Sequence, residues 1–154
     1  MSESPALPVL GPEPAVAYFE VVFPATEAAI GPVRRRLRGR LNESGLAQIA
    51  DDVVLAAGEL MTNAVVHGCH GLRPVSEVTL TAVWTEERLR IAVADPSDAL
   101  PTEQQESVCR DGGRGLTLVD ALSDRWGVEP DSPGPGKRVW LELDLAVTTE
   151  ECVA

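Results

Sequence analysis

Three side chains suited to binding a metal ion and a phosphate recur at four-residue spacing in one apolar segment. They are Glu59, Asn63 and His67, and Gly68 follows them. Residues four apart lie on the same face of an α-helix, so we expect an acid, an amide and an imidazole along one side of a helix that ends at the glycine. The residues expected to face the core instead are Leu60, Ala64 and Val65.

A glycine cluster about fifty residues later forms a second candidate site. It comprises Asp111, Gly112, Gly113, Arg114, Gly115 and Leu116, and an apolar helical run follows. Glycines allow backbone N–H groups to approach an anion closely, and the N-terminus of a helix adds partial positive charge. A cation ligand and a phosphate cradle in one chain predict binding of a magnesium nucleotide. The Glu–Asn spacing alone fits a solvated polar face equally well.

Length and charge restrict the class of protein. The chain has 154 residues and a net charge of −11, which indicates one domain and argues against a nucleic-acid backbone or an anionic membrane as a direct partner. No apolar stretch approaches the ~20 residues of a membrane span, and the N-terminus lacks a basic region, so we expect a cytoplasmic protein. Three scattered cysteines favour reduced thiols over a disulfide framework.

Periodicity predicts five strands and three helices in the order βααββαββ. The expected strands are residues 15–23, 75–84, 88–94, 125–129 and 138–145; the expected helices are 26–42, 46–67 and a last one from the glycine cluster to residue 122. This order predicts an α/β (α+β) fold, a two-layer sandwich of a mixed, mostly antiparallel sheet with helices on one face. The expected domain is 15–146, after a disordered lead-in of residues 1–14 and before a flexible tail of residues 147–154.

Two other patterns are set aside. The run ending in Gly136 and Lys137 resembles the end of a P-loop, but Asp131 stands where a glycine is required, Arg138 replaces Ser or Thr, and a strand follows. Cys69 and His70 beside His67 lack a second pair of metal ligands.

The helix motif, Asp95 at the end of an expected strand and the Gly–Arg–Gly–Leu helix start together resemble the GHKL superfamily of ATP-binding domains, which have the Bergerat fold. More narrowly, the chain looks like the stand-alone anti-sigma-factor serine/threonine kinases of actinobacteria. The resemblance covers residues 16–145 and implies ATP and Mg²⁺ as cofactors.

The resemblance also implies roles for single residues. Asn63 matches the asparagine that holds Mg²⁺ on the phosphates, Glu59 the acid that accepts the proton of the attacking hydroxyl, and Asp95 the acid that binds the adenine amino group. His67 matches a position that faces the phosphates. The phosphate-gripping glycine box corresponds to Gly112, Gly113, Arg114, Gly115 and Leu116.

Simpler interpretations stay open for three of these residues. Asp95 also suits a turn after a strand, Arg114 suits a solvated position, and His67 suits a helix C-terminus, where the helix dipole favours a basic residue. The chain also departs from the family pattern. Asp95 is followed by Pro96 instead of a glycine hinge, and Arg138 stands near the place of a threonine that supports adenine binding. ATP binding alone would therefore not establish phosphotransfer.

A single ATPase domain is expected to act on a separate protein. The resemblance implies a serine/threonine kinase that phosphorylates a STAS-type anti-sigma antagonist and sequesters a sigma factor; the alternative is a nucleotide-gated binding module without phosphotransfer. Five arginines within residues 34–40 form either a solvated helix face or a docking surface for an acidic partner. Since this helix contributes to dimer contacts in the relatives, a homodimer is also expected.

Overall fold

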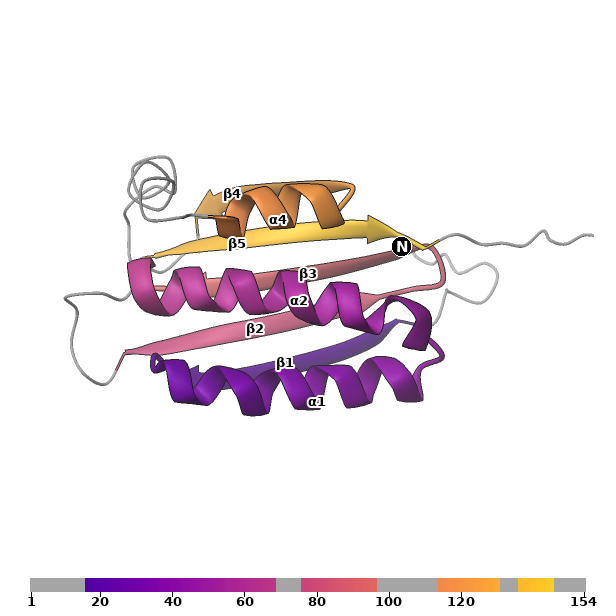
Figure 1. The fold of residues 1–154 in the computed structure, drawn as a ribbon, viewed down its shortest axis with the longest axis horizontal. Coiled ribbons are helices and arrows are strands. Elements are labelled where there is room, and N and C mark those ends of the chain that lie inside the picture. The colour runs from indigo at the N-terminus through magenta and orange to yellow at the C-terminus, as the bar shows by residue number, and fades with distance from the viewer. Residues whose placement is uncertain (1–15, 69–75, 97–113, 131–135, 146–154) are drawn as a thin grey trace, which may run out of the picture.

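A five-stranded sheet with the strand order β1-β2-β3-β5-β4 carries its helices on one face (Figure 1). The structure is a computed structural model and describes residues 16–68, 76–96, 114–130 and 136–145. Cys69, His70, Cys109, Gly112 and Gly113 lie outside these ranges, as do the expected N-terminal lead-in and C-terminal tail. The two-layer α+β sandwich expected from the order of the elements is confirmed.

The strands follow the predicted segments closely. They are β1 (Ala17–Pro24), β2 (Glu77–Trp84), β3 (Arg88–Asp95), β4 (Arg125–Pro130) and β5 (Lys137–Asp144). All four ladders between these described strands are antiparallel, so the sheet contains no parallel pair among them. The expected hairpin of β2 and β3 is present, with Trp84 opposite Leu89.

The helices differ from the prediction at two ends. They are α1 (Ile30–Glu43), α2 (Ala47–Asn63) and α4 (Arg114–Leu122), with a 3₁₀ turn η1 (Glu27–Ala29) before α1 and a π-helical segment η2 (Ala64–Gly68) after α2. The first helix was predicted to begin at residue 26, but the Thr26 side chain makes no capping hydrogen bond and α1 begins only after η1. None of the described helices combines the length and the apolarity that a membrane crossing requires.

The core lies between the sheet and the helices. Along β1, Phe19, Val21 and Phe23 are buried while Tyr18 and Val22 are exposed, because successive side chains of a strand point to opposite faces. The buried residues of α1 recur every three or four positions: Ile30, Val33, Leu37 and Leu41. This periodicity places one apolar stripe of the helix against the sheet. None of the described helices lies on the other face of the sheet, which we call the helix-free face (Figure 1).

Candidate functional site

One end of the sandwich collects the elements that carry the candidate residues. The C-terminal ends of α2 and β3 lie there, together with the first turn of α4 (Figure 1). The start of β5 lies at the same end because Asp95, the last residue of β3, pairs with Lys137, the first residue of β5. Helix α2 packs against α4, and η2 contacts β3. Residues that are far apart in sequence are thus brought to one edge of the molecule.

Glu59 and Asn63 occupy one face of α2, as the spacing predicted. Both are half-buried, whereas Leu60, Met61 and Ala64 between and beside them are buried in the core. The carboxylate and the amide therefore lie at the border of the apolar layer. An amide oxygen and a carboxylate are the oxygen donors that Mg²⁺ prefers, and both groups are only partly screened by solvent here.

The regular helix ends at Asn63, and the chain continues as the π-helical segment η2. A π turn closes its hydrogen bonds between residues five apart, and such turns inside helices are frequent at functional sites. His67 lies within η2, so the third residue of the predicted helix face belongs to the π-helical segment and not to α2. The structure does not describe the side chain of His67. The change in helix type directly follows the candidate metal ligand.

Asp95 forms a buried ion pair with Lys137. Asp95 Oδ1 lies 3.2 Å from Lys137 Nζ, and the two side chains are only 1% and 6% exposed. Removing one partner of a buried pair typically costs about 3–5 kcal/mol, because it leaves a charge without compensation. The acid at the strand end is therefore buried in an ion pair and is not a solvated residue.

Gly136 holds the start of β5 against the end of β3. Its φ angle is +105°, a backbone conformation that favours glycine. A Cβ atom at this position would lie 2.9 Å from the Cα of Pro96 and would overlap the carbonyl oxygen of Asp95. The glycine thus allows a close approach of two backbones beside the ion pair, next to the proline that replaces the expected glycine hinge.

Arg138, which was expected near the place of the adenine-supporting threonine, directly follows Lys137 at the start of β5. Arg138 pairs with Glu129, on the helix-free face of the sheet, and its neighbour Lys137 points to Asp95. The sequence did not predict that Gly136 and Lys137 lie beside Asp95, because these two residues were considered only as part of a rejected P-loop pattern. The available signal was the single lysine of the chain at the start of a strand.

The glycine cluster leads directly into α4. Arg114 is the first residue of this helix, Gly115 is the second, and Leu116 is buried at 7% exposure. Leu116 and Val119 anchor the helix in the core, which fixes where its N-terminus lies. The side chain of Arg114 is not described. A helix N-terminus presents unpaired backbone N–H groups and a partial positive charge, which suits a phosphate.

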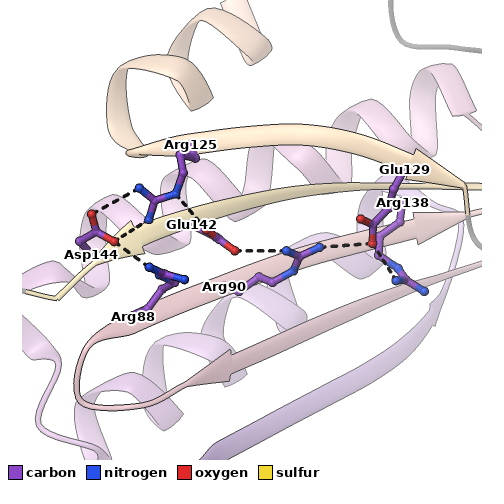
Figure 2. Close-up of polar contacts among 7 residues, drawn as sticks. All are labelled: Arg88, Arg90, Arg125, Glu129, Arg138, Glu142 and Asp144. Carbon is purple, nitrogen blue, oxygen red and sulfur yellow. Dashed lines mark hydrogen bonds and ion pairs between the residues drawn. The ribbon is translucent and has the colours of Figure 1, made fainter.

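An ion-pair network on the helix-free face ties β3, β4 and β5 together (Figure 2). Arg90 bridges Glu129 and Glu142, each at 3.2 Å. Arg125 binds Glu142 at 3.0 Å and Asp144 at 2.5 Å. The guanidinium of Arg90 also lies 4.6 Å from the ring centre of Trp140, a cation–π contact. The network supports the register that places Lys137 opposite Asp95.

The network also shifts the pKa values of its members. Burial raises the pKa of Glu142, but hydrogen bonds from Arg125 and Arg90 outweigh it and hold the pKa below its ordinary value. The hydrogen bond from Arg125 likewise lowers the pKa of Asp144. The pKa of the Arg125 guanidinium is raised by its hydrogen bonds to Asp144 and Glu142. All these charges are therefore fully formed at neutral pH.

Other features of the described residues contribute little to this site. A hollow of about 440 Å³ lies on the helix-free face, with Tyr18, Thr81 and Arg90 among its lining residues, on the opposite side of the sheet from Glu59 and Asn63. No cluster of three or more His, Cys, Asp or Glu side chains that could hold a metal ion occurs within the described ranges. A Mg²⁺ ion commonly binds through one or two side chains together with substrate phosphates.

Most of the chain is similar to known proteins. Residues 23–143 match the family described as the histidine kinase-like ATPase domain. The chain is 30% identical to a serine-protein kinase RsbW of Bacillus licheniformis over 131 residues, which cover 77% of this chain and 81% of the relative. It is 25% identical to a serine-protein kinase RsbW of Staphylococcus aureus, with 75% of this chain and 80% of the relative covered.

Proposed function

Because the chain belongs to the histidine kinase-like ATPase domain family, we propose that it is an ATP-binding regulator that phosphorylates serine or threonine on a separate protein. One observation carries the proposal most directly. Glu59 and Asn63 share a half-buried face of α2, and this helix ends at the edge of the molecule where β3 ends in the buried Asp95. The elements that carry these three residues thus end at the same edge of the molecule, which supports the proposal.

Each residue has a task that its chemistry allows. The amide oxygen of Asn63 is a ligand for Mg²⁺. Glu59, one helical turn away, is assigned the role of the general base that accepts the proton of an attacking hydroxyl. Asp95 is assigned to accept a hydrogen bond from the amino group of adenine. When bound, magnesium ATP supplies the transferable phosphoryl group.

The phosphates are assigned to the start of α4. The backbone N–H groups of Gly112, Gly113 and Gly115 are suited to bind phosphate oxygens, and Arg114 is suited to neutralise charge on the transferred group. Leu116 fixes the helix in the core. His67 is assigned to the side of the phosphates at the end of η2, where an imidazole can donate a hydrogen bond.

The partners are proposed from the relatives and from charge. We expect a cytoplasmic protein that phosphorylates a STAS-type anti-sigma antagonist and sequesters a sigma factor. Arg34, Arg35 and Arg36 are exposed on α1, whereas Arg38 pairs with Asp51 and Arg40 donates a hydrogen bond to the carbonyl oxygen of Tyr18. On a protein of net charge −11, the exposed arginines form a complementary surface for an acidic partner.

Transfer of a labelled γ-phosphate tests the kinase assignment. The protein is incubated with ATP, Mg²⁺ and STAS-type proteins encoded in the same genome, and nucleotide binding is measured separately. Glu59→Ala should keep binding and lose transfer, and Asn63→Ala should weaken the Mg²⁺-dependent part of binding. Asp52→Ala is the matched control, because Asp52 is an exposed acid on the same helix and its loss should change neither property.

Two outcomes decide between the candidate functions. If ATP binds but label never reaches a protein, the chain is a nucleotide-gated binding module without phosphotransfer. If transfer persists in Glu59→Ala at the rate of the unchanged protein, Glu59 is not the base. Failure of ATP to bind folded protein in magnesium buffer contradicts both functions.

The docking surface and the expected homodimer have their own tests. The double substitution Arg34→Ala and Arg35→Ala should weaken partner binding, most strongly at low salt, without changing ATP affinity. Unchanged partner affinity at low salt contradicts the docking role. Sedimentation over a range of concentrations should show a dimer, and a monomer at all concentrations contradicts that expectation.

A further inference from the structure

Lys137 is the only lysine of the chain, and it is buried against the acid that the proposed function assigns to the purine base. The chain has 13 Lys and Arg residues, of which all others are arginines. Lys137 is also the only basic residue classified as buried among the described residues. A lysine ammonium is a compact point charge on a flexible stem, whereas a guanidinium is a broad planar group. The residue type therefore matches a narrow buried position.

The ammonium of Lys137 places a positive charge beside the carboxyl group of Asp95. A buried carboxyl group without a compensating charge tends to take up a proton and become a hydrogen-bond donor. The positive charge of Nζ, 3.2 Å from Oδ1, favours the carboxylate form of Asp95, which only accepts hydrogen bonds. The antiparallel register of β3 and β5 and the close contact of Gly136 fix the backbone on both sides of this pair.

Resting on the proposed function, we propose that Lys137 is a positioning residue that sets the preference of the site for a 6-aminopurine nucleotide. The 6-amino group of adenine donates a hydrogen bond to the Asp95 carboxylate. A 6-oxo group, as in inosine triphosphate, instead brings a second acceptor, which the carboxylate repels. One hydrogen bond to a charged group changes affinity by roughly tenfold to a hundredfold, so ATP should bind more tightly than inosine triphosphate by that factor.

Calorimetric titrations with ATP and with inosine triphosphate, both with Mg²⁺, test this role. The unchanged protein should show the preference, and Lys137→Met should lose most of it because ATP affinity falls more than inosine triphosphate affinity. Arg138→Met is the matched control: it removes the neighbouring positive charge, which lies on the other face of the sheet and pairs with Glu129, and it should keep the preference. A purely structural role of Lys137 would weaken both nucleotides in parallel.

A second variant covers the case in which Lys137→Met fails to fold. Combining it with Asp95→Asn removes both charged side chains that are buried among the described residues. An amide both donates and accepts hydrogen bonds, so this double variant should bind the two nucleotides with similar affinity. Because the chain has one lysine, selective ¹⁵N-lysine labelling gives a single side-chain ammonium signal. This signal should shift on addition of ATP and stay unchanged with inorganic triphosphate.

The outcomes separate this inference from the proposed function. The role of Lys137 is overturned if folded Lys137→Met still prefers ATP over inosine triphosphate as strongly as the unchanged protein. It is also overturned if the ammonium signal does not shift at saturating ATP. In both cases ATP binding itself stands. If the unchanged protein binds neither nucleotide, the proposed function fails, and the role of Lys137 fails with it.

Discussion

Gly136 lies so close to Asp95 that the carbonyl oxygen of Asp95 occupies the space a side chain at position 136 would need. The glycine also has a φ angle of +105°, which disfavours any L-residue with a side chain. Backbone conformation and close packing thus both require glycine beside the buried Asp95–Lys137 pair. The contact between β3 and β5 at this position therefore leaves no room for a side chain.

Gly136→Ala should accordingly destabilise the protein and impair nucleotide binding. Gly45 is the matched control, because its φ angle is +79° but nothing lies within 4 Å of an added Cβ. Gly45→Ala should cost only the backbone term of about 1–2 kcal/mol, and Gly136→Ala should cost clearly more. Urea denaturation measures the free energy of unfolding of each variant. If the two variants lose the same free energy of unfolding, the close contact at Gly136 contributes nothing to stability.

Leu60→Ala should destabilise the fold through the core beneath the candidate residues. Leu60 is 2% exposed on α2, between Glu59 and Asn63 in the sequence. Truncating a buried leucine typically costs about 2–5 kcal/mol, because a cavity remains. Leu55 on the same helix is 40% exposed, so Leu55→Ala should cost about 1 kcal/mol or less. Thermal unfolding of both variants checks the difference, and similar losses would contradict the assigned packing of α2.

The ion-pair network should stabilise the protein in a pH-dependent way. The folded-state pKa values of Glu142 and Asp144 lie below their ordinary values, so the stabilisation is fully present above about pH 4 to 5 and is lost as the pH falls through the lowered values. Arg125→Met should therefore lower the urea midpoint at pH 7 and have less effect near pH 3. Arg35→Met, at an exposed position of α1, should change the urea midpoint by the same amount at pH 7 and near pH 3. A deficit of Arg125→Met that stays constant over this range would contradict the linkage.

Magnesium ATP should stabilise the folded state. A ligand that binds only the folded protein, at a hundred times its Kd, contributes about 2.7 kcal/mol, which corresponds to a rise in Tm of roughly 5–10 °C for a domain of this size. Chelation of Mg²⁺ should remove most of this rise, and Asn63→Ala should reduce it. An equal rise with and without Mg²⁺ would contradict the role of Asn63 as a metal ligand.

The local elements and their buried faces were predictable from the sequence. The alternation of Phe19, Val21 and Phe23 and the four-residue spacing of Glu59 and Asn63 are set by the backbone geometry of a strand and a helix. Such geometry relates residues that are close in sequence, so it needs no knowledge of the rest of the fold. The same spacing placed the candidate acid and amide on one helix face, where the structure has them.

The partner of Asp95 was decided only by the tertiary structure. Asp95 and Lys137 are 42 residues apart, and they meet because β5 lies beside β3 in a strand order that does not follow the chain. A shift of one residue in that register would turn Lys137 to the helix-free face and Arg138 toward the core. The sequence alone thus determined which segments form strands and which side chains could do chemistry. The pairing of distant strands, which depends on how all the buried surfaces pack together, determined which of those side chains meet.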